Sequence, residues 1–188
     1  MVSAIRSLGF ISLLLIFSQL SLASAPRDPY QYFFEQSMGD LTEELTIAKG
    51  EGKKGLFVFF EMDECPFCHR MKTTVLNQSD IQQFFKKNFH SIAIDIEGDL
   101  EMVDFDGNRT TQKEFASKAR VRATPVMAFY DLEGQQVVRF TGAASGSEEF
   151  MWLAEYYLQD VYKMTAENGR KISFSNYKRL KKQQKSTN

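Results

Sequence analysis

Two cysteines stand three residues apart in the motif Cys65-Pro66-Phe67-Cys68, and the 188-residue chain has no others. A dithiol at this spacing suits thiol–disulfide exchange, in which one thiolate attacks a partner disulfide and the second thiol resolves the mixed disulfide. A bridge between them would close too small a loop to stabilise a fold, and two cysteines cannot form a four-cysteine zinc site. We therefore expect Cys65 and Cys68 to be catalytic, with no metal and no cofactor beyond their own redox-active disulfide.

The segments on either side of the motif predict how it is held. Residues 55–60 are apolar, aromatic and β-branched, which predicts a buried strand, and residues 66–76 predict a helix. Pro66 suits the first helical position, because its missing N–H has no partner there. This places Cys65 at the helix N-terminus, where free N–H groups and the helix dipole favour a thiolate.

The remainder of the chain alternates helical and strand patterns, which predicts an α/β fold. Helical spacing occurs near residues 32–48, 79–85, 111–119 and 145–161, and strand patterns occur at 91–96, 125–130 and 136–141. Residues 97–109 are polar and acidic and predict an excursion from the sheet, either a loop or a hairpin.

A strand that opens at Thr124-Pro125, well downstream of the dithiol, makes the chain similar to the thioredoxin superfamily from about residue 41 to 161. The resemblance implies a thioredoxin fold, with a central mixed sheet of about four strands, flanking helices and here an N-terminal helical extension. It also implies that Pro125 is cis and that the backbone of Thr124 pairs with bound substrate. We expect Pro66 and Phe67 to contribute to the same substrate-binding surface.

Within that superfamily the chain resembles exported thioredoxin-like proteins of the SoxW type. The shared segments are Phe60-Glu61, Cys-Pro-aromatic-Cys, residues 104–107, 111–116 and 121–125, and Phe129-Tyr130-Asp131. This resemblance implies a reductase of protein disulfides or sulfur-carrying substrates, supplied with electrons by a membrane donor. A disulfide oxidase or isomerase remains the alternative, and Cys-Pro-Phe-Cys also resembles the glutaredoxin dithiol, which keeps glutathione as a partner.

Three residues around the dithiol depart from cytosolic thioredoxins or modulate the site. Glu64 replaces the tryptophan before the first cysteine, and its charge opposes thiolate formation at Cys65. Phe59 stands where a buried acid is expected, which leaves the proton acceptor for Cys68 open. Glu61 is a candidate, although an exposed surface carboxylate is its simpler interpretation.

Two other classes of function fit parts of the sequence. Cys65-Pro66-Phe67-Cys68-His69 matches the attachment motif of c-type haem, with His69 as proximal ligand and Met102 or Met127 as the distal one. Because the motif follows a buried strand, we favour His69 as a first-turn helix residue whose charge modulates the thiolate. A binding module without catalysis is the other alternative.

Composition and end segments set the domain limits. Residues 1–25 resemble a signal peptide, which predicts export, for example to a periplasm. Residues 26–163 form the expected thioredoxin-like domain, and 164–188 a basic, partly disordered tail. The net charge of −1 gives no reason to expect nucleic acid as a partner.

Overall fold

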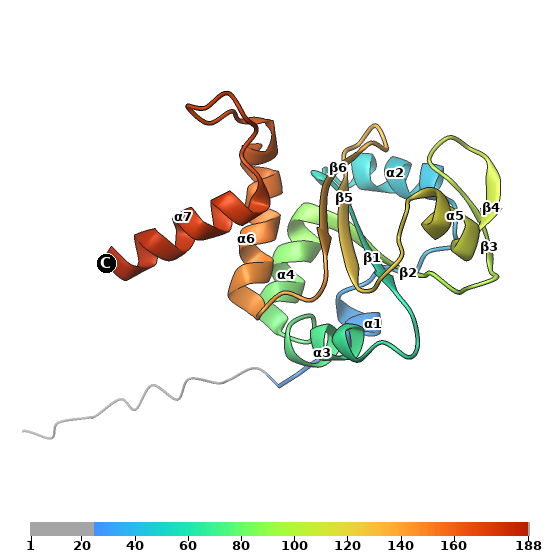
Figure 1. The fold of residues 1–188 in the computed structure, drawn as a ribbon. Coiled ribbons are helices and arrows are strands. Elements are labelled where there is room, and N and C mark those ends of the chain that lie inside the picture. The colour runs from blue at the N-terminus through green and yellow to red at the C-terminus, as the bar shows by residue number, and fades with distance from the viewer. Residues whose placement is uncertain (1–24, 188) are drawn as a thin grey trace, which may run out of the picture.

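A four-stranded mixed sheet in the order β2-β1-β5-β6 forms the centre of the fold (Figure 1). The computed structural model describes residues 25–187, so the predicted signal peptide lies outside the described residues except for Ala25. The strands are β1 Gly55–Glu61, β2 Phe89–Asp95, β5 Val126–Tyr130 and β6 Gln136–Thr141. β1 runs parallel to β2 and antiparallel to β5, which is antiparallel to β6, and this confirms the predicted thioredoxin fold.

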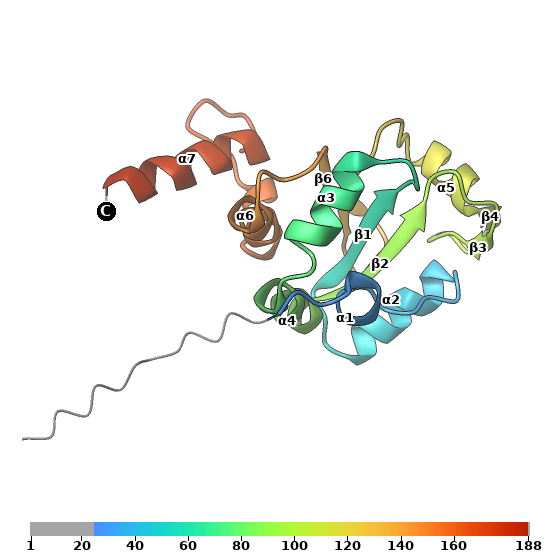
Figure 2. The same cartoon turned by 90° about the horizontal axis from the view of Figure 1, so that it is seen from below.

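Helices cover both faces of this sheet. The helices are α1 Pro29–Tyr32, α2 Leu41–Gly50, α3 Pro66–Thr74, α4 Ser79–Asn88, α5 Gln112–Lys118, α6 Ser147–Leu158 and α7 Phe174–Thr187, with a 3-10 turn η1 at Val161–Lys163. In Figures 1 and 2, α4 and α6 lie on one side of the sheet, and α2 and α5 lie on the other. The predicted hairpin is present as β3 Glu101–Val103 and β4 Arg109–Thr111. Within residues 25–187, no helix is both long and apolar enough to cross a membrane.

Strand β1 is buried along its whole length and divides the core in two. Alternate side chains of a strand point to opposite faces of its sheet. Phe57 and Phe59 pack with the cluster that includes residues of α3, α4 and α6, whereas Leu56, Val58 and Phe60 pack with residues of α2 and α5. The strand that leads to the dithiol is therefore fixed by packing on both faces.

The N-terminal segment forms two helices where the sequence predicts one region of helical spacing. Phe33 and Phe34 follow α1 and are buried in the core, so the chain leaves the helix to insert both rings. Gly39 adopts φ +85°, a conformation that favours glycine. Asp40 then caps α2, because its carboxylate accepts hydrogen bonds from the N–H groups of the next helix turn.

Helix α7, residues 174–187, forms much of the segment that the sequence predicts as a basic tail. Phe174 and Tyr177 are buried, and three lysines of α7 pair with acids of α6. These pairs are Lys178–Glu149 at 2.9 Å, Lys181–Glu155 at 2.7 Å and Lys185–Glu148 at 2.8 Å. The basic run is therefore partly neutralised by an acidic helix face that lies far from it in the sequence.

Asp104 organises the turn between β3 and β4. Its carboxylate, which is 3% exposed, accepts hydrogen bonds from the N–H groups of Asp106 and Asn108 and from Nζ of Lys118 at 2.7 Å. Burial alone would raise the pKa of Asp104, but the bonds from Lys118 and Asn108 outweigh it and lower this pKa to about 2. The ionised carboxylate thus stabilises the fold.

We expect Asp104→Asn to reduce the free energy of unfolding by about 2 kcal/mol at neutral pH. Because the folded-state pKa lies below the unfolded value, this stabilisation is complete above about pH 4 and disappears as the pH falls through about 2. Urea unfolding of both proteins across this range checks the expectation. A difference that stayed constant down to about pH 2 would contradict a role for the carboxylate charge.

Candidate functional site

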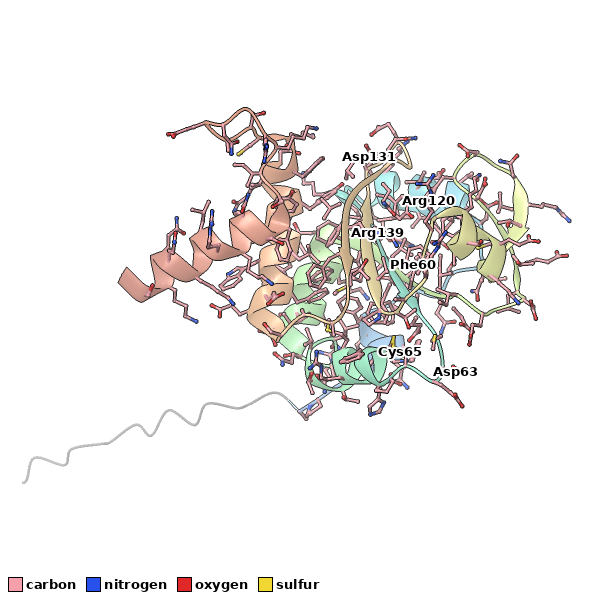
Figure 3. All side chains as sticks on the ribbon, viewed as in Figure 1. Phe60, Asp63, Cys65, Arg120, Asp131 and Arg139 are labelled. Atoms are coloured by element: carbon pink, nitrogen blue, oxygen red, sulfur yellow. A yellow bond between two sulfur atoms is a disulfide. The ribbon has the colours of Figure 1, made fainter. Side chains whose placement is uncertain are left out.

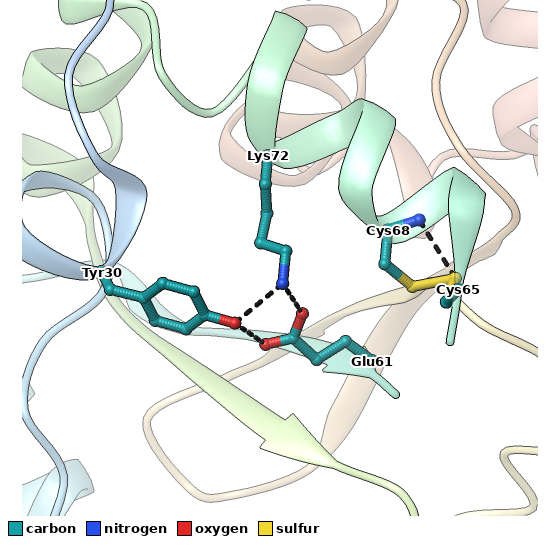
Figure 4. The surroundings of a disulfide bond; sticks show 5 residues. All are labelled: Tyr30, Glu61, Cys65, Cys68 and Lys72. Atoms are coloured by element: carbon teal, nitrogen blue, oxygen red, sulfur yellow. Dashed lines mark hydrogen bonds and ion pairs between the residues drawn. A yellow bond between two sulfur atoms is a disulfide. The ribbon is translucent and has the colours of Figure 1, made fainter. Parts of the chain in front are cut away.

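The dithiol lies where β1 passes into α3, as the sequence predicts. Cys65 is the N-cap of α3, and Pro66 occupies the first helical position. Sγ of Cys65 accepts a hydrogen bond from the N–H of Cys68 at 3.0 Å, and the two sulfurs form a disulfide (Figure 4). Cys65 is 6% exposed and Cys68 is 1% exposed, so the first sulfur is the more accessible one.

The Thr124–Pro125 peptide bond is cis, which confirms the predicted geometry of this loop. Val126, the first residue of β5, pairs with Phe60 near the C-terminal end of β1. Pro125 immediately precedes Val126, so it lies at the same end of the sheet as the loop that carries the dithiol. Pro125 is buried and Thr124 is half-buried. Among the described residues, neither the N–H nor the C=O of Thr124 has a hydrogen-bond partner, so both groups are free to pair with an extended peptide.

The outer surface of the motif is apolar at Pro66 and Phe67. Phe67 is 56% exposed, with the guanidinium of Arg70 at 5.5 Å from its ring centre, and Pro66 is also exposed. Glu64 and His69 are exposed, and their side chains make no hydrogen bond or ion pair with any described residue. They can act on the dithiol only through solvent-screened charge. Figure 3 shows Cys65 and Asp63 near each other, at the end of the sheet where α3 begins.

Glu61, the last residue of β1, is buried at 7% exposure. The interpretation of Glu61 as an exposed surface carboxylate is therefore wrong. The Glu61 carboxylate accepts hydrogen bonds from Nζ of Lys72 at 2.6 Å and from the hydroxyl of Tyr30 at 2.6 Å (Figure 4). Lys72 also donates to the Tyr30 hydroxyl at 2.8 Å. Lys72 stands one helical turn after Cys68 on the same face of α3, so the three polar groups lie beside the dithiol.

The two partners of Glu61 are held in their protonated forms. Burial, and then the hydrogen bond to Glu61, raise the pKa of Tyr30. Burial acts to lower the pKa of Lys72, but the hydrogen bonds and charge of Glu61 and Tyr30 outweigh it, so that this pKa is also raised. Near neutral pH, Lys72 therefore remains cationic and Tyr30 remains a donor, and both orient the carboxylate.

Strand alternation explains why the acid is at Glu61. Phe59 and Glu61 point to the same face of the sheet, which is the face covered by α3. Phe59 is fully buried, and its ring centre lies 5.8 Å from that of Phe34. The position expected to hold an acid is thus filled by core packing, and a carboxylate follows two residues later on the same side. No local pattern pointed to Tyr30, which lies 31 residues before Glu61.

The haem alternative does not fit this packing. Met127 is fully buried in the middle of the sheet, Met102 in β3 is 5% exposed, and Cys68 is part of the core cluster. His69 is exposed, and neither methionine is part of the α3 surface. In the described part of the chain, no group of three or more His, Cys, Asp or Glu side chains could hold a metal ion.

Comparisons with known proteins agree with this geometry. The family of the thioredoxin-like domain matches residues 41–158. A thioredoxin-fold protein from Helicobacter pylori is similar, with a TM-score of 0.58, 20% identity, and coverage of 70% of this chain and 86% of that one. A putative disulphide-isomerase from Bacteroides thetaiotaomicron has a TM-score of 0.54, 26% identity, and coverage of 73% and 98%. A DsbH oxidoreductase has a TM-score of 0.51, 20% identity, and coverage of 69% and 88%. No curated protein sequence matches the chain.

Proposed function

The chain belongs to the family of the thioredoxin-like domain, and we propose that it is an exported thiol–disulfide oxidoreductase. Its substrates would be protein disulfides or protein-bound sulfur. The observation that carries the proposal is the disulfide between Cys65 and Cys68 at the N-terminus of α3, at the edge of the sheet where the cis Pro125 loop lies. A buried pair of this kind does little for the fold, whereas it is what exchange chemistry requires.

The reaction begins from the reduced dithiol. The Cys65 thiolate attacks one sulfur of the substrate disulfide, whose S–S bond breaks as a mixed disulfide forms. The first substrate sulfur leaves as a thiolate and takes a proton from solvent. Cys68 then loses its proton and attacks Sγ of Cys65. The Cys65–Cys68 disulfide forms, and the second substrate thiolate leaves and is protonated. Two electrons pass to the substrate, and an external thiol donor must restore them for the next turnover.

In this scheme, we assign Glu61 as the base that accepts the proton lost by Cys68. Cys68 is almost fully buried, so its deprotonation needs a base within the protein. Glu61 is a buried carboxylate on the face of β1 that α3 covers, and it is linked through Lys72 to the same helix face as Cys68. Figure 4 shows its oxygens directed toward Lys72 and Tyr30, with no bond to either sulfur, so the carboxylate must reorient to accept this proton.

The substrate would lie across the two loops that meet at this edge. The free backbone groups of Thr124 can pair with an extended peptide, and the buried Pro125 keeps the loop in place. The exposed ring of Phe67, with Pro66 beside it, supplies an apolar contact for the substrate side chains that flank its disulfide. Glu64 and His69 would modulate the reaction through their charge.

Reduction is the direction we propose, on the SoxW-type resemblance, with electrons arriving from a membrane donor. That resemblance and the signal peptide-like residues 1–25 together support an exported location. The similarity to a putative disulphide-isomerase supports disulfide chemistry in general, and it keeps oxidation or isomerisation as the second candidate. Glutathione remains a candidate donor because the dithiol resembles that of glutaredoxins.

The reduction potential of the Cys65–Cys68 couple tests the proposed direction. The purified protein is equilibrated in thiol–disulfide buffers of known potential, and the reduced fraction is counted by alkylation and mass spectrometry. We expect a value near that of thioredoxin, about −270 mV. A value near that of DsbA, about −120 mV, would contradict a reductase and favour the oxidase. Failure of the couple to exchange with any buffer would contradict both.

A further inference from the structure

A hollow of about 480 Å³ opens beside Tyr30, on the outer edge of the sheet. Its walls are the segment between α1 and α2, the edge strand β2 and the start of β3. The residues that line it are mostly apolar, including Phe34, Ile92, Ile94 and Met102. A volume of this size is typical of a binding site rather than of a packing defect.

Strand β2 leaves one residue of its outer edge open at this hollow. Ile96, which directly follows β2, donates its N–H to the C=O of Glu61 in β1. The backbone N–H and C=O groups of even-numbered residues in β2 therefore point toward β1, and those of odd-numbered residues point away from the sheet. The outward C=O of Ser91 accepts the N–H of Glu35 at 2.7 Å. The next outward residue, Ala93, lines the hollow, and its N–H and C=O have no partner among residues 25–187.

The rim of the hollow combines apolar and acidic groups. Met38 is 91% exposed and Leu100 is 70% exposed, and both line the hollow. Glu35 and Glu101 line it too, and neither carboxylate forms an ion pair with a described residue. No lysine or arginine is among its described lining residues, although Arg109 lines a smaller adjoining hollow. The rim therefore suits a ligand with apolar and basic groups.

We propose that this hollow binds an extended polypeptide segment with apolar and basic side chains, which adds to the edge of β2 at Ala93. An open strand edge is a template for such pairing, because main-chain hydrogen bonds supply affinity and side-chain pockets supply specificity. The exposed Met38 and Leu100 would be covered by apolar side chains of the segment, and Glu35 and Glu101 would pair with its basic ones. This binding goes beyond the proposed function, since it needs neither cysteine.

Hydrogen exchange at the Ala93 amide tests the proposal. The probe is a synthetic hexapeptide of alternating valine and lysine with blocked ends, added to the ¹⁵N-labelled full chain. We expect binding, and exchange of the Ala93 amide slowed about tenfold when the peptide is at roughly ten times its dissociation constant. A peptide with glutamate in place of lysine is the matched control, and we expect at least tenfold weaker binding from it.

Two variants separate edge pairing from contact elsewhere. Ala93→Pro removes the outward N–H without removing a bond to β1, and we expect at least a tenfold loss of affinity. If this variant does not fold, a probe with alternate N-methylated peptide bonds takes its place and is expected to lose affinity equally. The double variant Glu35→Gln with Glu101→Gln should abolish the preference for lysine. Binding that leaves Ala93 exchange unchanged, equal binding of both peptides, or no binding up to roughly 1 mM would overturn the proposal.

Discussion

Replacement of Cys65 with serine is expected to lower the rate of disulfide reduction by about 1000-fold or more. The attacking sulfur is lost, and a serine hydroxyl cannot replace a thiolate as the nucleophile in disulfide exchange. The same substitution should barely change the fold, because the disulfide closes too short a loop to stabilise it. Reduction of insulin by the pre-reduced protein, followed by turbidity, measures the rate, and circular dichroism monitors the fold.

Cys68→Ser is the matched variant, and its expected result differs. Cys65 can still attack, but nothing resolves the mixed disulfide, so the protein should accumulate as a covalent adduct with its substrate. Non-reducing electrophoresis and mass spectrometry detect the adduct and identify the sulfur that carries it. An adduct on Cys68 in the Cys65→Ser protein, and none on Cys65, would reverse the assigned roles. Full biological activity of the double variant would instead favour a binding module without catalysis.

Glu61→Gln is expected to slow the resolving step by about 100-fold near neutral pH. The amide keeps the shape of the side chain, but it cannot accept the proton that Cys68 must lose. In the variant, no protein base takes the proton, so the rate of this step should follow hydroxide concentration alone. Single-turnover release of substrate thiol from the mixed disulfide, measured across a range of pH, separates this step from the initial attack.

A second buried carboxylate provides the control for that experiment. Glu44 on α2 is 4% exposed and pairs with His90 on β2, in the half of the core that faces away from α3. Glu44→Gln should therefore disturb stability to a similar degree without altering the resolving step. An equal loss in both variants would show that the effect of Glu61→Gln is structural, and unchanged kinetics in Glu61→Gln would remove Glu61 as the proton acceptor.

Local sequence was sufficient for the parts of the site that depend on neighbouring residues. Pro66 begins a helix because of its fixed φ and missing N–H, and this alone places Cys65 at the N-cap. The buried run of β1 and the alternation of β6 likewise follow from residue type. The cis bond before Pro125 came from a resemblance in which two motifs at a given separation support each other.

The rest of the site depends on contacts between distant segments, which no local pattern records. Glu61 resembles a surface carboxylate until Lys72 and Tyr30, 11 and 31 residues away, are seen to surround it. Helix α7 has the composition of a solvated tail, and only its pairing with the acidic face of α6 shows why it is ordered. The open edge at Ala93 is also a property of strand order rather than of sequence.

The pH dependence of alkylation at Cys65 tests most directly whether this sulfur is the attacking thiolate. The reduced protein is treated with iodoacetamide across a range of pH, and the modification of each cysteine is followed by mass spectrometry. We expect Cys65 to react first, with a midpoint below the value of about 8.5 for a free thiol, while Cys68 stays protected by burial. A Cys65 midpoint at or above about 8.5, or faster modification of Cys68, would contradict the assignment.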